Sequence, residues 1–286
     1  MTRFEKPDSA LDYDLCRYGA SRVKFRGPKR PLDGEYVAAI GGSQTYGRYV
    51  EVPFVDALEA QIGEPVVNLG GMQAGLTLIA DDPDILRVAK KARLTVLQVL
   101  GAQNMSNRFY SVHPRRNDRF VSASASLQGA FPTIDFTEFH FTGHLLKALT
   151  DSGQSALTPV IAELKTAWVS RMEMILRAIP GETVLLWMAD RRPEDPSQLG
   201  NPLDPHYVDR EMLEKVSHRT AGIVEVVADD IARSEGLQGK VCLEHETQAA
   251  EAMPGPLYHS QVATALASVI RQPGNARRAD ISRRVS

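Results

Sequence analysis

The chain has 286 residues, of which 43% are hydrophobic and 24% are charged, and its formal net charge at pH 7 is −2. This composition is typical of a soluble globular protein that is long enough to bury a substantial core. Because the net charge is close to zero, it excludes an overall electrostatic attraction to nucleic acid or to an anionic membrane.

The cysteines and the hydropathy pattern narrow the class of protein further. Cys16 and Cys242 lie too far apart in sequence to suggest a disulfide framework. No zinc-type spacing of cysteine and histidine occurs, so we expect no metal and no other cofactor. The chain starts with a polar, acidic stretch and has no apolar run long enough to span a bilayer. This predicts a cytoplasmic protein without a membrane span or a nucleic-acid partner.

The order of apolar and helical patterns predicts the fold class. Residues 1–34 are mixed polar and contain Pro28 and Pro31, which predicts an N-terminal arm lying on the domain. Apolar runs predict strands at residues 36–40, 65–69, 94–100, 183–189 and 241–243. Helical patterns cover residues 53–62, 81–92, 155–179, 206–236 (with a break near Gly222) and 260–271. This alternation predicts one α/β domain over residues 35–271, a three-layer α/β/α sandwich with a five-stranded parallel sheet.

Two segments depart from this rhythm. Residues 105–153 are rich in arginine, histidine and phenylalanine within a loop-like composition. Long connections inside a compact domain are usually functional, so we expect this insertion to be a lid or the contact of a homo-oligomer. Residues 272–286 are arginine-rich and contain Pro273 and Gly274, which predicts a basic flexible tail.

Polar and glycine-rich turns follow three of the predicted strands. Gly41, Gly42 and Ser43 follow the first, Gly70 and Gly71 the second, and residues 101–104 the third. The last loop leads to a histidine at position 259. Ligands bind at the carboxyl ends of parallel strands, so we expect these groups to meet at one edge of the sheet.

The residue types in these turns suit acyl transfer. Ser43 needs a base to act as a nucleophile, and His259 is the candidate. A tetrahedral oxyanion needs preorganised donors. The backbone N–H of Ser43, the backbone N–H of Gly70 or Gly71, and the side-chain amide of Asn104 are the candidates. Taken singly, Ser43 also suits a helix cap and His259 an ordinary histidine at a helix start.

The same residues resemble the SGNH (GDSL-like) hydrolase superfamily. Residues 41–47, Gly-Gly-Ser-Gln-Thr-Tyr-Gly, are similar to its first block, Gly-Asp-Ser-x-Thr-x-Gly. Residues 68–75 resemble the second block, residues 101–104 the third, and His259 the histidine of the fifth. The resemblance implies a flavodoxin-like fold, a catalytic Ser43 and His259, and oxyanion donors at Gly70 and Asn104.

Three departures from the family pattern affect the expected site. Gly42 replaces the aspartate of the first block, and Asn104 comes one position late, so Gln103 could hold the donor position. Pro256 stands where the family has the aspartate that supports the histidine. The carboxylates that could replace it are Glu251, Glu244 and Glu246, and a backbone carbonyl could also orient the ring.

We therefore expect a serine-dependent ester hydrolase or acyltransferase acting on a small acyl ester, of a carbohydrate or of an anionic metabolite. Gln44, Gly71 and Gln103 would contact this small-molecule substrate, together with Arg108, Arg115 and Arg116 if its leaving group is anionic. The alternative is a catalytically degenerate module of the same fold that binds an anionic sugar or nucleotide, which the missing aspartate favours.

Overall fold

The centre of the computed structural model, which describes residues 10–201 and 203–271, is a five-stranded parallel sheet. Its strands are β1 (Val37–Gly41), β2 (Val66–Gly70), β3 (Leu94–Gln98), β6 (Glu182–Ala189) and β7 (Gly222–Val227). They lie in the order β2-β1-β3-β6-β7, and each pairs in parallel with its neighbours. This is the flavodoxin-like doubly wound order, so the predicted fold class is confirmed.

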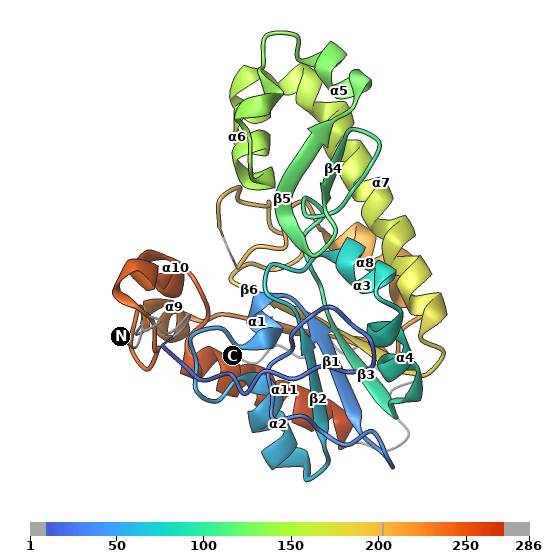
Figure 1. Cartoon of the computed structure of the whole chain (residues 1–286), viewed down its shortest axis with the longest axis vertical. Helices are drawn as coiled ribbons and strands as arrows, with labels where there is room; N and C mark the ends of the chain where they lie inside the picture. The colour runs from blue at the N-terminus through green and yellow to red at the C-terminus, as the bar shows by residue number, and fades with distance from the viewer. Residues whose placement is uncertain (1–9, 202, 272–286) are drawn as a thin grey trace, which may run out of the picture.

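Helices cover both faces of the sheet (Figure 1). On one face lie α2 (Phe54–Ile62) and α11 (Pro256–Ile270), which share a core with β1. The other face carries α3 (Leu76–Asp81), α4 (Pro83–Lys91), α7 (Gln154–Ala178) and α8 (Arg210–Ser217). Short helices also belong to the sheet domain: α1 (Ser43–Tyr46), α9 (Asp230–Ser234), η2 (Glu244–Glu246) and α10 (Thr247–Glu251). Within the described ranges, no helix combines the length and apolar character needed to cross a bilayer.

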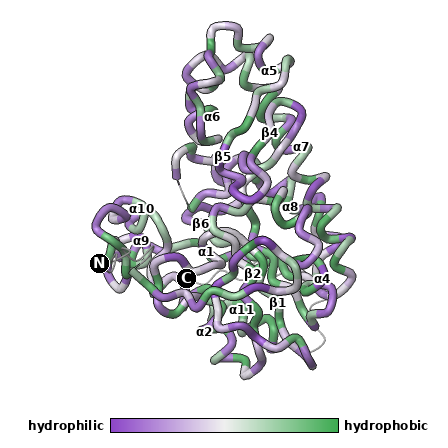
Figure 2. The backbone as a smooth tube through the Cα atoms, viewed as in Figure 1, coloured by the Kyte–Doolittle hydropathy of each residue, from purple (hydrophilic) through white to green (hydrophobic). Residues whose placement is uncertain are grey.

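Strand β1 illustrates why these runs form buried strands. Val37 and Ala39 belong to the core under α2 and α11, whereas Ala38 and Ile40 belong to the core under α4 and α7. All four side chains are fully buried, because alternate residues of a strand point to opposite faces. Figure 2 shows hydrophobic stretches in the region of β1, while the outer loops are mostly hydrophilic.

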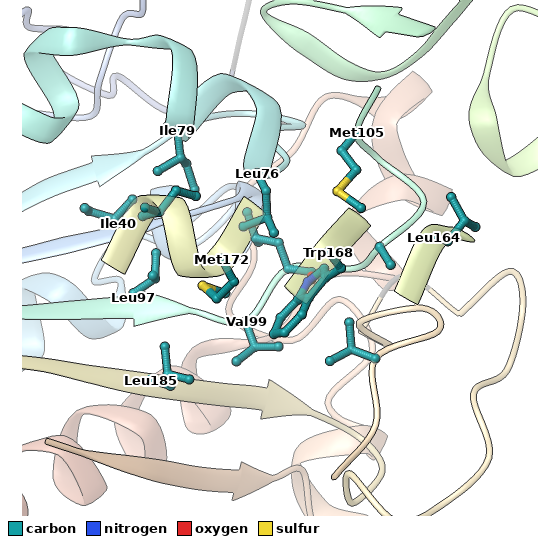
Figure 3. Packing of buried hydrophobic residues seen from close by; sticks show 14 of the residues in the cluster. Ile40, Leu76, Ile79, Leu97, Val99, Met105, Leu164, Trp168, Met172 and Leu185 are labelled. Carbon is teal, nitrogen blue, oxygen red and sulfur yellow. The ribbon is translucent and has the colours of Figure 1, made fainter. Parts of the chain in front are cut away.

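Trp168 of α7 connects the larger core to the edge of the sheet where the strands end. Its ring packs between Leu76 of α3 and Val99, the residue after β3 (Figure 3). The indole Nε1–H donates a hydrogen bond to Leu100 O at 2.7 Å. The long helix predicted over residues 155–179 therefore anchors the loop that follows β3.

One part of the sequence prediction was wrong. Residues 206–236 are not one interrupted helix, because Gly222–Val227 forms the edge strand β7, with Val224 opposite Leu186 of β6. Residues 241–243 are not the fifth strand; Lys240 makes only an isolated bridge to Val50. Apolar periodicity alone does not separate a short strand from one face of a helix.

The 105–153 insertion forms a separate layer beyond the end of the sheet, together with part of α7 (Figure 1). It contains the hairpin β4 (Tyr110–His113) and β5 (Arg116–Ala123), α5 (Ala125–Ala130), η1 (Phe136–Glu138) and α6 (Thr142–Ser152). Asn117 is fully buried and fastens the hairpin to the sheet domain. Its Oδ1 accepts hydrogen bonds from Gly75 N at 2.8 Å and Leu78 N at 3.0 Å. The basic tail predicted over residues 272–286 lies outside the described residues.

The backbone of α1 lies so close to Gly70 of β2 that a side chain there would clash. A Cβ at Gly70 would lie 2.2 Å from Tyr46 N and 2.7 Å from Thr45 C. Backbone atoms cannot yield, so we expect Gly70→Ala to reduce the free energy of unfolding by about 1–3 kcal/mol in urea denaturation. Gly143→Ala is the control, since a Cβ there meets nothing within 4 Å; its helix should be unchanged or up to about 1 kcal/mol more stable. Equal stability of Gly70→Ala and wild type would contradict this packing.

Candidate active site

A cavity of about 350 Å³ opens at the carboxyl ends of the central strands. Ser43 and Gln44 reach it from the end of β1, Gln103 and Asn104 from the loop after β3, and Met188 from the end of β6. This is the edge at which doubly wound folds bind ligands. The structure thus brings together four of the residues that the sequence singled out.

The turn before Ser43 depends on Gln98, a buried residue at the end of β3. The Gln98 Oε1 atom accepts hydrogen bonds from Gly42 N at 3.0 Å and from Thr45 Oγ1 at 2.7 Å. A Cβ at Gly41 would lie only 2.1 Å from Thr45 Oγ1, so a glycine is required there. Ser43 then becomes the first residue of α1, and its half-buried hydroxyl is directed to the cavity.

Three residues that line the cavity, Ser43, Gln73 and Asn104, carry N–H groups that could donate hydrogen bonds there. Ser43 N belongs to the first turn of α1, where backbone N–H groups have no partner within the helix. Gln73 N donates a hydrogen bond to Ser43 Oγ at 2.9 Å. Asn104 Oδ1 accepts a hydrogen bond from Thr142 Oγ1 at 2.6 Å, which leaves the Asn104 Nδ2 group to donate elsewhere.

The predicted oxyanion role of Gly70 and Gly71 requires a correction. Gly70 N donates to Asn68 Oδ1 at 2.9 Å, and Gly71 N donates to Gly41 O at 3.0 Å. Both backbone N–H groups therefore already donate hydrogen bonds within the protein, and neither glycine lines the cavity. Gln73, which has a left-handed φ of 57°, instead directs its N–H to Ser43. Such strained non-glycine conformations cluster at functional sites.

His206 is the histidine that shares the cavity with Ser43, and sequence reasoning missed it. It is 8% exposed, and its Nδ1 lies 3.2 Å from Asp204 Oδ2. This contact lacks hydrogen-bond geometry, so the buried Nδ1 has no hydrogen-bond partner among the described residues. Ala102 N donates a hydrogen bond to His206 O at 2.9 Å, which joins this loop to the one that carries Asn104. The residue after His206 is Tyr207, which like Gln73 is a non-glycine residue with a left-handed φ, of 65°. Asp14 and Tyr49 share this conformation away from the cavity lining.

Asp204 is fixed and ionised by its surroundings. Its side chain is fully buried, with Arg191 Nε at 2.6 Å from Oδ1, and Ser197 Oγ and Gln198 N at 2.6 Å from Oδ2. Burial raises the pKa of Asp204, but the close contact of His206 and the hydrogen bonds from Ser197 and Arg191 lower it more, so the pKa is below its ordinary value. An ionised carboxylate at Nδ1 orients an imidazole and leaves its Nε2 free to act as a base.

The loop from 190 to 209 contained a signal that could have identified this pair. Asp204-Pro205-His206 lies in the loop after a strand of the parallel sheet, at the same edge as Ser43. The family pattern predicts the base in the loop after the last strand, with its aspartate three residues earlier, and His206 and Asp204 match neither position.

The structure contradicts the prediction that His259 faces Ser43. His259 is 1% exposed within α11, does not line the cavity, and stacks on Phe54 with ring centroids 6.1 Å apart. Its Nδ1 accepts a hydrogen bond from Phe54 N at 3.0 Å, so it caps α2. In the described part of the chain, its buried Nε2 has no hydrogen-bond partner. Burial lowers the pKa of His259 to about 3, with smaller effects of Arg26 and Lys240.

The other predicted polar residues also lie outside the cavity. Glu251 is exposed, and Glu246 pairs with Arg48 at 2.8 Å, so neither carboxylate supports a catalytic histidine. Arg108 pairs with Glu163 at 3.1 Å. Two further arginines predicted to bind substrate are exposed on the hairpin, at positions 115 and 116. Over residues 10–201 and 203–271, no three His, Cys, Asp or Glu side chains are placed to hold a metal ion.

Comparisons with known proteins place this geometry in context. The model of a family described as "Domain of unknown function (DUF6473)" matches residues 1–273. No curated protein matches the chain. Among solved structures, the chain is similar to the lipase Lip_vut3 from a goat rumen metagenome, with 12% identity and a TM-score of 0.41 over 82% of this chain and 97% of that one.

Two further solved structures are similar to the chain at the same low level. One is a lipase/acylhydrolase from Enterococcus faecalis, with 12% identity and a TM-score of 0.41, covering 83% of this chain and 95% of that one. The other is a putative lipolytic protein of the G-D-S-L family from Desulfitobacterium hafniense DCB-2, with 15% identity and a TM-score of 0.39, covering 82% and 99%.

The buried His259 makes stability depend on pH. Its pKa is 6.5 in the unfolded chain and about 3 in the folded one, so between these values the proton binds mainly to the unfolded state. Its contribution to the free energy of unfolding should therefore fall as pH falls through this window, by up to about 1.4 kcal/mol per pH unit. His259→Asn keeps an acceptor for Phe54 N but does not titrate. Denaturation at a series of pH values should give this variant a shallower slope than wild type; parallel slopes would contradict the assignment.

Proposed function

The chain belongs to a family described only as a domain of unknown function, DUF6473, and we propose from its site that it is a serine-dependent ester hydrolase. The observation that carries the proposal is the pairing of Asp204 with His206 inside the cavity that Ser43 lines. A serine hydroxyl, an imidazole and a buried carboxylate are the three groups that nucleophilic acyl transfer needs.

The proposed reaction has two halves. Ser43 Oγ attacks the carbonyl carbon of the ester while His206 Nε2 takes the hydroxyl proton, and Asp204 stabilises the imidazolium that forms. The tetrahedral oxyanion accepts hydrogen bonds from Ser43 N, Gln73 N and Asn104 Nδ2. When the bond to the alcohol breaks, His206 returns its proton to the leaving oxygen and an acyl-serine remains.

Release of the acyl group uses the same base. His206 removes a proton from a water molecule, the hydroxide attacks the acyl-serine, and Ser43 regains its proton as the acid leaves. If an alcohol takes the place of water, the same steps transfer the acyl group. The cavity volume of about 350 Å³ supports a small ester substrate in either case.

The carboxylate of Asp204 beside His206 weakens the case for the alternative function, a degenerate module that only binds a ligand. A degenerate module that only binds an anionic ligand was favoured by the aspartate missing before His259. Asp204 places a carboxylate beside His206 from another loop, so the aspartate missing before His259 does not favour the binding module. A fluorophosphonate probe distinguishes the two functions: mass spectrometry should find its adduct on Ser43, and an unlabelled serine would favour the binding module.

The roles of the two histidines can be separated by kinetics. With p-nitrophenyl acetate, Ser43→Ala should lower kcat/KM by at least about 10³-fold, and His206→Asn by about 10²- to 10⁴-fold, because each removes a group that acts in the transition state. His259→Asn is the matched control and should remain close to wild type at neutral pH. If His259→Asn is inactive and His206→Asn is active, the assignment of the base is wrong.

Asn104 can be tested as an oxyanion donor. Asn104→Ala should lower kcat by about 10²- to 10³-fold with little change in KM, since the donor acts on charge that develops in the transition state. Thr142→Val should lower kcat less, because it removes only the hydroxyl that orients the Asn104 amide. A large increase in KM at unchanged kcat would instead indicate ground-state binding.

A further inference from the structure

The insertion contributes one carboxyl group to the wall of the cavity. Asp118, in β5, lines it alongside Ser43 and Asn104. Thr142 Oγ1, which orients Asn104, also lies 3.3 Å from Asp118 O. The neighbouring residue Asn117 donates its backbone N–H to Gln73 O at 3.1 Å. Asp118 is therefore held by the same segments that position the proposed oxyanion donors.

The Asp118 side chain has an acceptor that the fold leaves unused. Its Oδ1 atom is buried and has no hydrogen-bond partner among the described residues, and the same holds for a second acceptor, Gln103 Oε1, and for His206 Nδ1 in the same cavity. Leaving a buried acceptor without a donor is costly, so each case in a folded protein needs an explanation. Burial raises the pKa of Asp118, more than the nearby Arg116 and Arg119 lower it. A bound molecule with hydrogen-bond donors would satisfy the two acceptor oxygens, Asp118 Oδ1 and Gln103 Oε1.

The charges around the cavity disfavour an anionic alcohol. Arg48 lines the cavity, but Glu246 pairs with it at 2.8 Å. The arginines at positions 108, 115 and 116, which would have recognised a phosphate or carboxylate, do not line the cavity. The carboxylate of Asp118 would repel such a group. The cavity thus offers acceptors to a ligand that carries neutral donors, namely hydroxyl groups.

We propose that Asp118 accepts a hydrogen bond from a free hydroxyl group of the substrate, which is an acyl ester of a polyhydroxylated alcohol such as a sugar. This inference rests on the proposed esterase function of the same cavity. It gives the insertion a defined part in the site, because Asp118 then selects the alcohol half of the substrate while the Ser43 side of the cavity performs the chemistry.

A matched pair of substrates tests the proposal. Monoacetylated methyl glucopyranosides, assayed as separate positional isomers, carry free hydroxyl groups, and cyclohexylmethyl acetate does not. Wild type should prefer at least one sugar ester by kcat/KM. Asp118→Ala should lower that preference by about 10- to 100-fold, the effect of losing a hydrogen bond to a charged group. Asp118→Asn retains an acceptor and the side-chain shape, so its preference for the sugar ester should lie between that of wild type and that of Asp118→Ala.

Glu138→Gln is the control variant. Glu138 is an exposed carboxylate of the same insertion that does not line the cavity, so its removal should leave the preference unchanged. If Asp118→Asn and Asp118→Ala both keep the wild-type preference, or if wild type prefers the cyclohexylmethyl ester to every sugar ester, the proposal is overturned.

A binding measurement separates this proposal from the esterase function. In Ser43→Ala protein, calorimetric titration with an intact sugar acetate should give a Kd that adding Asp118→Ala weakens by about 10- to 100-fold. Hydrolysis by Ser43→Ala at the wild-type rate would refute the proposed function. An unchanged Kd in the double variant, or no binding of any isomer to Ser43→Ala, would refute the role of Asp118.

Discussion

A buried ion pair between Arg191 and Asp204 fixes the part of the chain on which the proposed chemistry depends. The two side chains are 7% and 0% exposed, and their charged atoms lie 2.6 Å apart. The remaining donors of Arg191 bind backbone carbonyls of the same loop, at Arg192, Asp195, Pro205 and Val208. Buried charges persist only when they are paired and fully hydrogen-bonded, so the loop between β6 and α8 must close around this pair. That closure places His206 in the cavity and beside its carboxylate.

Buried amide side chains also fix backbone segments elsewhere around the cavity, by hydrogen bonds. Gln98 holds the turn before Ser43, Asn68 holds the end of β2, and Asn117 holds the insertion. Turns at strand ends leave backbone N–H groups that have no partner in a helix or sheet, and a buried N–H without a partner is costly. Amide side chains from neighbouring segments satisfy these groups. The backbone around the site is therefore held by hydrogen bonds although most of its residues lie in loops and in a four-residue helix.

His206 and His259 differ in the partner of Nδ1 rather than in burial. His206 and His259 are 8% and 1% exposed. The Nδ1 of His206 faces the carboxylate of Asp204, whereas the Nδ1 of His259 accepts a hydrogen bond from a backbone N–H. A carboxylate at Nδ1 supports an imidazolium, and an N–H donor at the same atom requires the neutral ring. The partner of Nδ1 thus makes His259 a structural cap, and the carboxylate beside Nδ1 is consistent with the base role proposed for His206.

The sequence by itself determined the fold class, the buried character of β1, β2 and β3, and the glycine turn that leads to Ser43. These features follow from apolar runs and glycines within a few residues of one another, and short-range backbone preferences act over that distance. Tertiary structure alone decided that β7 rather than residues 241–243 completes the sheet, that Asn68 uses the N–H of Gly70, and which histidine joins Ser43. Each of these depends on what a group contacts after folding. The partners of His259 and Ser43 come from segments 205 and 30 residues away, brought close by packing that no local pattern records.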